Sequence, residues 1–502
     1  MIAKSLESVK GTEFRFKWPD KSEISQGAFE IVNKLHRAGF ETYIAGGAVR
    51  DALLKRPITE IDIATSAKPA QVKKLFAKTI PTGEKHGTVT VMDPLLISPY
   101  SRANRGRKGS RVSPPPERKG EMKRGYEVTT FRLEGPYKDR RHPSKVKFIN
   151  SAQEDAGRRD FTINALFYDE EKNCVIDYVN GIADISHRKV RFIGKSEDRI
   201  KEDALRLLRA ARFSTTLNFG LARDTQRAVA KYARLIKNIS AERIKQELDR
   251  IMLSDRAAIG IGLLNVVGLL EHILPELKAC QGVAQPKNQH AEGDVYAHSL
   301  LALEQADETY DLPDRYGVLF HDLGKTQTRK IRDGKITFYD HPVVGAELAY
   351  KICRRLKSSR QETERIVWLV RNHMVPNDFT NMKLSTRRKW GLHPFFPSLL
   401  KIFLADAKAS LSPKGTAKSD LSSYREGKKI LREIEKQPEL ARPLISGSDV
   451  MKILRIEEGP RVGKILKIIE EKKLASQLKT KPDAIKFLEK NKTKLKNFSE
   501  QT

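Results

Sequence analysis

Two carboxylates one residue apart follow a double glycine near the start of this 502-residue chain, in GGAVRDALLKRPITEIDIAT (46–65). We expect EIDIAT to form a strand, and residues i and i+2 of a strand point to the same face. Glu60 and Asp62 then project side by side, and they repel each other unless a cation lies between them. Glu127, in the predicted strand YEVTTFR, supplies a third oxygen ligand. Mg²⁺ prefers such ligands and bridges them to phosphates, so these three residues are candidates for a catalytic magnesium site.

The double glycine and a second charged stretch suit a nucleoside triphosphate. Glycines let backbone amides approach a triphosphate closely. In EDAGRRDFTINALFYD, Arg158 and Arg159 offer forked donors to phosphate. Asp160 can orient one of these arginines, and Asn164 can reach a ribose hydroxyl.

A third stretch, EDALRLLRAARF, places a carboxylate acceptor and two guanidinium donors at helical spacing. Asp203, Arg206 and Arg209 fall at i, i+3 and i+6 of a predicted helix, so they share one face. A fixed Asp–Arg pair can imitate a pairing partner for a base, although the same spacing also forms an ordinary salt bridge. The candidate nucleotide-binding residues are Gly46, Gly47, Arg50, Arg158, Arg159, Asp160, Asn164, Asp203, Arg206 and Arg209.

These three stretches together resemble the signatures of bacterial tRNA CCA-adding enzymes (class II) and the related bacterial poly(A) polymerases. The resemblance implies that the glycines form the triphosphate turn and that the EDxxR aspartate and arginine read the incoming CTP or ATP. It also implies that Glu60 and Asp62 hold the metals. Glu60 stands where the family has its first aspartate, and its carboxylate reaches one methylene further out.

A second chemical centre is predicted further along the chain. HSLLALEQ and VLFHDLGKTQTR, with LADAKAS downstream, resemble the HD phosphohydrolase domain. The resemblance implies that two histidines and two aspartates bind a divalent metal of unknown identity, which activates water against a phosphate. These ligands are His298, His321, Asp322 and Asp406, and further histidines typical of such domains are His341 and His373.

The charge balance predicts a polyanionic partner. Lys and Arg number 94 against 63 Asp and Glu, a net charge of +31 that is spread along the chain. The N-terminus lacks the apolar run of a signal peptide, and the longest apolar run (257–270) is too short and glycine-rich to span a bilayer. Three scattered cysteines read as reduced, packed thiols. We therefore expect a cytoplasmic protein that does not bind membranes.

The patterning predicts an α+β fold, with a small mixed sheet at the N-terminus followed by helices. Strands are expected at EIDIAT, HGTVTVM, YEVTTFR and CVIDYVN, and helical periodicity dominates from about residue 195. With the resemblance, four domains are expected: a nucleotidyltransferase head at 1–185 with a basic flexible insert at 97–124, a nucleotide-recognition neck at 186–280, an HD domain at 285–412 and a helical tRNA-binding tail at 420–495.

The resemblance implies an enzyme that adds C, C and A to the 3′ end of tRNA from CTP and ATP, without a template and with pyrophosphate release. A poly(A) polymerase and an A-adding enzyme of the same superfamily stay open as alternatives. TTFRLEGPYKDRRHP resembles a flexible loop that CC-adding enzymes lack, which argues against a CC-only role. A hypothesis of another class is a polymerase-silent RNA-binding protein that keeps an HD hydrolase. The sequence leaves the oligomeric state open.

Overall fold

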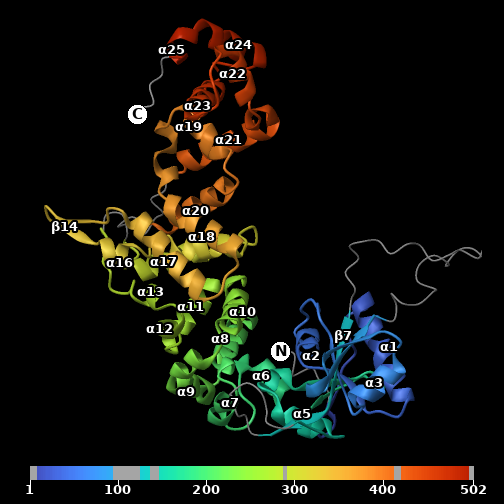
Figure 1. Cartoon of the computed structure of the whole chain (residues 1–502). Coiled ribbons are helices and arrows are strands. Elements are labelled where there is room, and N and C mark those ends of the chain that lie inside the picture. The colour runs from blue at the N-terminus through green and yellow to red at the C-terminus, as the bar shows by residue number, and fades with distance from the viewer. Residues whose placement is uncertain (1–7, 94–124, 136–145, 287–290, 412–419, 497–502) are drawn as a thin grey trace, which may run out of the picture. The chain divides into compact units, whose positions relative to one another are not determined.

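The computed structural model describes residues 8–93, 125–135, 146–286, 291–411 and 420–496 (Figure 1). The basic insert predicted at 97–124 lies outside the described residues. The chain forms two compact units, one of Met1–Glu247 with Val266–His272 and one of Leu248–Asn265 with Ile273–Thr502. The predicted division into four domains is finer than this and stays a prediction.

A mixed sheet, nine-stranded within the described residues, forms the centre of the first unit. Its strands lie in the order β1 (Ser8–Lys10), β2 (Glu13–Arg15), β11 (Cys174–Asp177), β10 (Leu166–Asp169), β3 (Thr42–Ala45), β4 (Asp62–Thr65), β7 (Gly125–Thr130), β6 (Thr88–Met92) and β5 (Thr79–Gly83). The β4–β7 pair is parallel, whereas the other described neighbours in this sheet pair antiparallel. The predicted strands are therefore present, in a larger sheet than expected.

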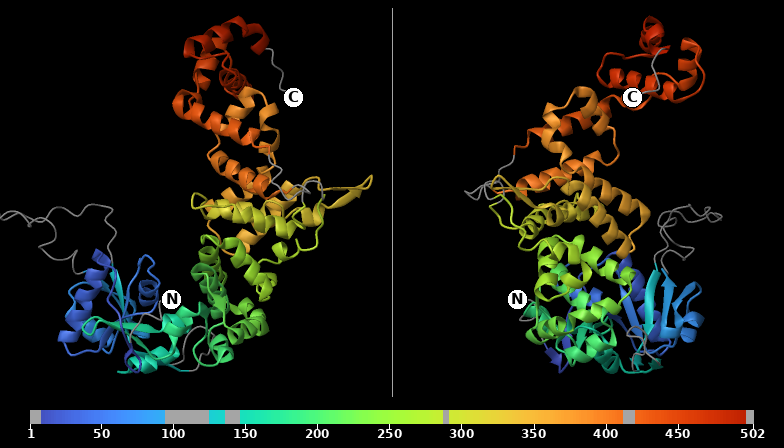
Figure 2. Two further views of the ribbon diagram at one scale, coloured as in Figure 1. Left: turned by 180° about the vertical axis from the view of Figure 1, so that it is seen from behind. Right: turned by 60° about the vertical axis from the view of Figure 1, so that its left-hand side comes forward.

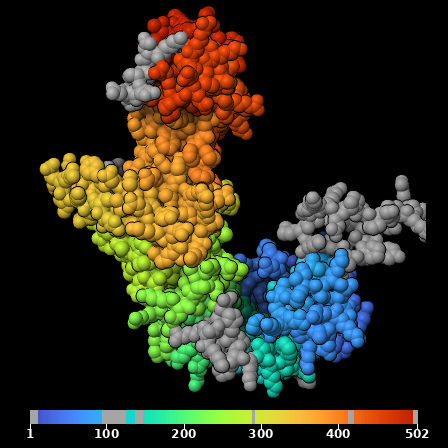
Figure 3. Space-filling view, in the orientation of Figure 1, coloured from blue at the N-terminus to red at the C-terminus, as the bar shows by residue number. Residues whose placement is uncertain are grey.

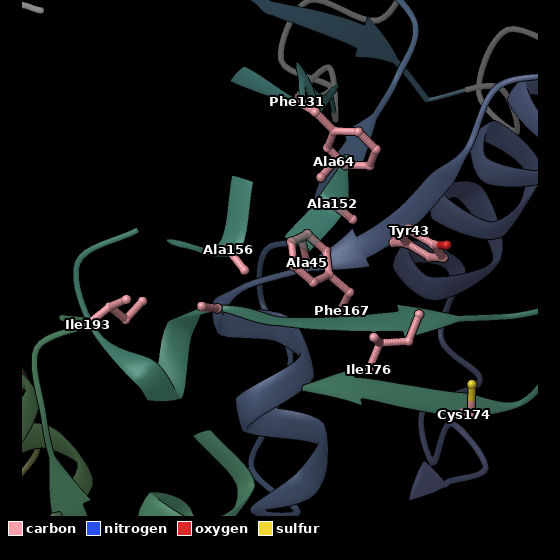
Figure 4. Packing of buried hydrophobic residues seen from close by; sticks show 11 residues of the cluster. Tyr43, Ala45, Ala64, Phe131, Ala152, Ala156, Phe167, Cys174, Ile176 and Ile193 are labelled. Atoms are coloured by element: carbon pink, nitrogen blue, oxygen red, sulfur yellow. The ribbon is translucent and has the colours of Figure 1, made fainter. Parts of the chain in front are cut away.

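Helices cover the sheet and close its core. On β3 and β4 packs α1 (Glu23–Arg37), and beside it α3 (Pro69–Leu75) packs on β6 and β7 (Figure 1). Tyr43 and Ala45 alternate with Ile44 along β3, so they point to the opposite face. There they lie in one cluster with Phe167 and with Ala152 of α5 (Ala152–Arg158), as Figure 4 shows.

Further short elements complete the first unit. The hairpin-like pair β8 (Arg132–Glu134) and β9 (Val146–Phe148) is antiparallel, and β12 (Lys189–Val190) pairs in parallel with β13 (Gly220–Leu221). The remaining helices are α2 (Gly47–Leu53), α6 (Gly181–Ser186), α7 (Ser196–Glu202), α8 (Leu205–Leu217), α9 (Arg223–Tyr232), α10 (Ala241–Met252) and α12 (Leu270–Ile273), of which α10 and α12 end at or beyond the unit boundary.

The second unit is helical in its described part, apart from one small hairpin. Its first helices are α11 (Ala257–Val266), α13 (Pro275–Lys278), α14 (Val295–Glu304), α15 (Leu312–Phe320), α16 (Lys325–Thr328), α17 (His341–Arg355), α18 (Arg360–Asn372), α19 (Leu384–Gly391), α20 (Phe396–Ala409) and α21 (Ser422–Lys436). Helices α14, α15 and α20 pack on one another, and α18 packs on α15 and α17.

The hairpin joins β14 (Lys330–Arg332) to β15 (Lys335–Thr337) and projects from these helices (Figures 2 and 3). Its two-residue turn is Asp333–Gly334, with φ of 50° and 71°. Positive φ at both positions matches the tight turns that suit the twist of a hairpin. The hairpin precedes His341 at the start of α17.

The C-terminal part of the second unit has its own small core. It consists of α22 (Gly447–Leu454), α23 (Pro460–Leu474), α24 (Lys481–Lys490) and α25 (Lys492–Lys496). Ile465 and Ile469 of α23 pack there with Val450 and Leu488. Pro460 is the first residue of α23, a position where the missing backbone N–H of proline costs no helical hydrogen bond.

The expectations about membrane-spanning segments and about the three cysteines can both be compared with the described residues. None of their helices is both long and apolar enough to cross a bilayer. Cys174, Cys280 and Cys353 are free and buried, as packed thiols should be. The predicted α+β class, with a mixed sheet followed by helices, is confirmed.

Candidate active sites

Asp62 and Glu127 lie side by side on the parallel strand pair of the first unit. Asp62 opens β4 and is the register partner of Glu127 in β7. Neighbouring strands lie about 4.8 Å apart, so register partners of a parallel pair project from the same face as close neighbours. Crowding by protein, then the negative charges of Glu127 and Glu60, raises the pKa of Asp62 to about 6, against the opposing charge of Arg159. The raised pKa marks a cluster of carboxylates short of positive charge.

Glu60 lies nearby but not on the strand, which corrects the expectation that EIDIAT is a strand throughout. Strand β4 begins at Asp62, where it pairs with Ala45, the last residue of β3. Beyond Ala45 the chain turns away at Gly46, so β3 offers no backbone partner to the residues before Asp62. Glu60 is therefore an exposed residue of the preceding link, within electrostatic reach of Asp62.

The double glycine turns β3 into α2. Gly46 has φ 74° and ψ −128°, a conformation that favours glycine, and Gly47 is the first residue of α2. A Cβ on Gly46 would lie 3.3 Å from Nη1 of Arg159, so the missing side chain lets this guanidinium approach the turn. Arg50 on α2 is buried and donates to Asp51 and, at 2.5 Å, to Oδ1 of Asn164.

Asp155 orients the two predicted phosphate-binding arginines. Arg158 Nη2 lies 2.7 Å from its Oδ1, and Arg159 Nη2 donates to its Oδ2 at 3.0 Å. Despite burial, which raises it, Arg159 and Arg158 hold the pKa of Asp155 below its usual range. The expectation that Asp160 plays this part is wrong, because Asp160 binds Arg209 of α8, with a separation of 2.5 Å to Nη2. The i−3 and i−4 spacing on α5 gives Asp155 its place beneath both arginines.

The predicted shared helix face of Asp203, Arg206 and Arg209 is also wrong at its first member. Asp203 has extended φ and ψ of −144° and 107° and links α7 to α8. Its carboxylate caps Leu205 and accepts from Arg243 at 2.7 Å. Arg206, on α8, donates instead to Glu202 and to the Arg199 carbonyl. Asp203 and Arg209 are thus each held by a partner 40 or 49 residues away.

The second unit gathers the predicted HD ligands. His298 comes from α14, His321 and Asp322 follow α15, and Asp406 comes from α20. His298 Nε2 lies 3.0 Å from Asp406 Oδ1 and 3.3 Å from His321 Nε2. His321 Nε2 lies 3.3 Å from Asp322 Oδ2. His298, His321 and Asp322 form a group whose ligand atoms all lie within 4.8 Å of one another.

Glu292 supports this cluster and was not foreseen from the sequence. Its buried carboxylate lies 2.7 Å from Nδ1 of His298, and its other oxygen accepts from the Leu411 amide. Although burial lowers it, hydrogen bonds to Asp406 and Glu292 raise the pKa of His298 to about 9. A carboxylate behind a ligating histidine fixes the ring and strengthens its donor nitrogen. Glu292 lies six residues before His298, a spacing that matches neither helical nor strand periodicity and so did not predict the contact.

His341 and His373 lie on the other side of Asp322. Their Nε2 atoms are 3.1 Å apart, and Oδ1 of Asp322 lies 3.5 Å from His341 and 3.8 Å from His373. This trio forms a second group of close ligand atoms. Lys325 donates to Asp322 Oδ2 at 2.6 Å and to Gln285 at 2.8 Å. Despite burial, His321 and Lys325 hold the pKa of Asp322 well below its usual range.

An open cavity of about 570 Å³ gives solvent access to this cluster. Asp322, His341, His373 and Asp406 line it together with Lys325. Its wall also includes two strongly exposed side chains, Tyr339 (65%) and Met374 (43%). The cavity therefore combines acidic and imidazole ligands with an ammonium group and apolar surface, a set that suits a phosphate ester with an organic substituent.

The fold and these two clusters define a nucleotidyltransferase-type head joined to an HD-type metal centre, and comparison with known proteins agrees. Residues 42–191 match the family described as "Poly A polymerase head domain", and residues 218–281 match "Probable RNA and SrmB- binding site of polymerase A". Residues 295–411 match the HD domain.

Curated relatives are CCA-adding enzymes. The one from Streptococcus gordonii is 42% identical over 253 residues, which is 50% of this chain and 56% of that protein. The one from Geobacillus thermodenitrificans is 37% identical over 304 residues, 61% of this chain and 64% of that protein. The chain thus spans between half and two thirds of the length of these relatives.

Solved structures show the same fold. The Bacillus stearothermophilus CCA-adding enzyme in complex with CTP is 26% identical, with a TM-score of 0.66 over 95% of this chain and 100% of that one. The Thermotoga maritima CCA-adding enzyme complexed with tRNA-CCA shares the fold at 16% identity, with a TM-score of 0.53 over 94% and 96% of the two chains. Three parts of this chain thus match a polymerase head family, an RNA-binding family and the HD domain, and the similar proteins described above are named CCA-adding enzymes.

Proposed function

We propose that this protein adds C, C and A to the 3′ end of tRNA from CTP and ATP, without a nucleic-acid template and with release of pyrophosphate. The observation that carries the proposal is the Asp62–Glu127 pair, crowded and short of positive charge, beside the Gly46 turn and Arg159. Similarity to proteins named CCA-adding enzymes supports this choice of reaction. Acting on tRNA, the protein works in the cytoplasm.

Asp62 and Glu127, with Glu60 from the adjoining link, are the residues that hold Mg²⁺ in this proposal. Their oxygens and the raised pKa of Asp62 fit a hard divalent cation. When bound, Mg²⁺ supplies charge that favours the ionised tRNA hydroxyl and the departing pyrophosphate. The 3′ hydroxyl of the tRNA attacks the α-phosphate, while Arg158 and Arg159, fixed by Asp155, bind the phosphate oxygens.

Asp203 and Arg206 read the edge of the incoming base in this proposal. Arg243 holds the Asp203 carboxylate in place as an acceptor. Arg206 is buried against Glu202, so base reading requires its guanidinium to exchange that carboxylate for the nucleotide. Arg206→Lys, which keeps the charge but not the planar fork, should blur the choice between CTP and ATP more than it slows incorporation. Unaltered selectivity would exclude Arg206 from base reading.

Labelled CTP and ATP, offered separately and together to three RNAs, separate the alternatives. The RNAs are a tRNA transcript that ends before CCA, one that ends in CC, and an unstructured RNA. A addition confined to the CC-ended transcript would indicate an A-adding enzyme, and long A-tracts on the unstructured RNA would indicate a poly(A) polymerase. Inactive wild type with activity restored by Glu60→Asp would support the polymerase-silent hypothesis.

We propose a phosphohydrolase activity for the HD cluster, acting on phosphomonoesters or cyclic phosphates at RNA ends. The ligand set of His298, His321, Asp322 and Asp406 fits a divalent cation, whose bound form supplies an activated water. Lys325 is placed to receive a phosphate oxygen at the cavity wall. The double substitution His321→Ala and Asp322→Ala should abolish hydrolysis, and unchanged hydrolysis would remove the proposal.

A further inference from the structure

The hairpin of β14 and β15 carries its positive charge on one face. Side chains alternate across a strand, and register partners of an antiparallel pair share a face. Arg332 is the register partner of Lys335, and Lys330 lies two residues before Arg332, so these three cations form one basic face. Ile331 and its register partner Ile336 lie on the opposite face. The hairpin therefore has a basic face and an apolar face.

The basic face is unfavourable for the hairpin by itself. Like charges directly opposite each other on neighbouring strands repel, which lowers the stability of the strand pair. All three cations are exposed, and Ile331 on the other face is 64% exposed. Lysines on an exposed edge strand hinder pairing with other chains, but that purpose does not require the charges to share one face. A polyanion bound along the basic face would relieve the repulsion.

The basic face adjoins the wall of the cavity beside the HD cluster. Tyr339, which is 65% exposed, lines this cavity together with Asp322. The guanidinium of Arg332 lies over the Tyr339 ring, 5.2 Å from its centre, in a cation–π contact. Ile336 and Phe338, on the second arm of the hairpin, line the same cavity. The hairpin thus joins the cavity to a row of cations through one exposed aromatic ring.

We infer that the basic face of the hairpin binds the sugar-phosphate backbone of a single-stranded RNA whose terminal phosphate lies in the HD cavity. The inference rests on the proposed HD phosphohydrolase and specifies its substrate as an RNA chain rather than a free nucleotide. Cations along the backbone and an aromatic ring against a base are the combination by which single strands are bound without sequence preference. Lys330, Arg332 and Lys335 contact the phosphates, and Tyr339 offers its exposed ring to a base near the RNA end.

Two substrates that share the reacting group separate binding of the RNA chain from binding inside the cavity. The first is an RNA decamer that ends in a 2′,3′-cyclic phosphate, and the second is 2′,3′-cyclic AMP. Both are offered to the full-length protein without CTP or ATP. The triple variant Lys330→Gln/Arg332→Gln/Lys335→Gln should raise the KM for the decamer at least about tenfold, because three phosphate contacts are lost. Its kcat for the decamer and its KM for cyclic AMP should not change.

The salt dependence of the reaction gives a second measure of the same contacts. Each phosphate contact to a single strand contributes about 0.7 to the slope of log affinity against log salt concentration. The slope of log kcat/KM for the decamer should therefore be shallower by about 2 in the triple variant. The slope for cyclic AMP should be the same in the variant and the wild type.

The matched control removes the same number and kinds of charge from another exposed surface. Lys351→Gln/Arg354→Gln/Lys357→Gln takes away two lysines and one arginine at and just beyond the C-terminal end of α17. All six substituted positions are exposed, so both triple variants should fold, which circular dichroism checks. The control variant should keep the wild-type KM for both substrates.

Three kinetic outcomes would overturn the inference. They are equal KM values of the wild type for the decamer and cyclic AMP, an unchanged decamer KM in the hairpin variant, and a rise in KM that is the same for both substrates or for the control variant.

If neither substrate is hydrolysed, the phosphohydrolase proposal fails and photocrosslinking decides the inference separately. The decamer, with 4-thiouridine at its penultimate position, is irradiated with the protein in EDTA, and the crosslinked residues are mapped by mass spectrometry. Crosslinks within residues 329–340 that the hairpin variant loses and the control variant keeps would support the inference. Their absence from the wild type would overturn it.

Discussion

At the scale of single residues, the two candidate sites compensate their carboxylates in opposite ways. Asp322 has buried histidines and the ammonium group of Lys325 in contact, and its pKa is held well below the usual range. Asp62 has Glu127 and Glu60 nearby, and crowding with these charges raises its pKa to about 6. Asp322 therefore has compensating positive groups within the chain, whereas Asp62 lies among further carboxylates that the chain compensates less.

Asp62 should make the stability of the metal-free protein depend on pH with a definite sign. Its pKa is about 6 in the folded chain and about 3.8 in the unfolded chain, so the folded state holds the proton more tightly. The stabilisation of the folded state by the protonated Asp62 carboxyl group is present at pH 4 and is lost as the pH rises through 6. In EDTA, Asp62→Asn should raise the Tm relative to wild type at pH 7 and have less effect at pH 4.5, measured by circular dichroism. An equal change in Tm at pH 7 and at pH 4.5 would contradict the raised pKa of Asp62.

Gly46→Ala should damage both stability and nucleotide binding. The positive φ strains an alanine by about 1–2 kcal/mol, and its Cβ would press on Arg159 from 3.3 Å. We expect a lower denaturation midpoint and a higher KM for CTP and ATP. Gly157→Ala in α5 is the matched control, since its Cβ meets nothing within 4 Å, and it should be neutral or slightly stabilising. Equal effects of the two changes would refute the role of the Gly46 turn.

At the scale of elements, the sequence predicts what depends on local pattern. The expected strand patterns correspond to β4, β6, β7 and β11, and the raised pKa of Asp62 agrees with the prediction that it has carboxylate neighbours. Partners set by tertiary packing were missed: Asp160 binds Arg209 and Asp203 binds Arg243, over 49 and 40 residues. No local periodicity encodes such pairs, because the partners lie far apart in the chain and are brought together only by tertiary packing.

The glycine of the Leu-Gly-Lys that follows His321–Asp322 is required because Gly324 packs directly against the backbone of α17. A Cβ on Gly324 would lie 2.0 Å from the His341 carbonyl oxygen and 2.6 Å from the Gly345 nitrogen, both backbone atoms of α17. Gly324→Ala must push α17, with His341, away from Asp322, at a cost of about 1–3 kcal/mol. The thermal denaturation temperature of the variant and its content of bound metal should both fall. Gly463→Ala in α23, with nothing within 4 Å, should change neither, and unaltered metal content in Gly324→Ala would contradict this packing.

At the scale of the whole molecule, the net charge of +31 should govern tRNA binding more than nucleotide binding. Each phosphate that the protein neutralises releases counterions, so tRNA affinity falls steeply with salt. Between 50 and 200 mM KCl we expect tRNA affinity to fall at least about tenfold. The affinity for CTP should change much less over the same range. Fluorescence anisotropy of labelled tRNA, with CTP titration as control, measures both, and a flat tRNA response would contradict an electrostatic footprint.

The decisive measurement for the proposed CCA addition is the length and sequence of the product made on a tRNA transcript that lacks CCA, with CTP and ATP both present. We expect growth by three nucleotides, C then C then A, followed by arrest, and loss of this product in Asp62→Asn. Growth without arrest, addition of a different sequence, or full activity in Asp62→Asn would contradict it.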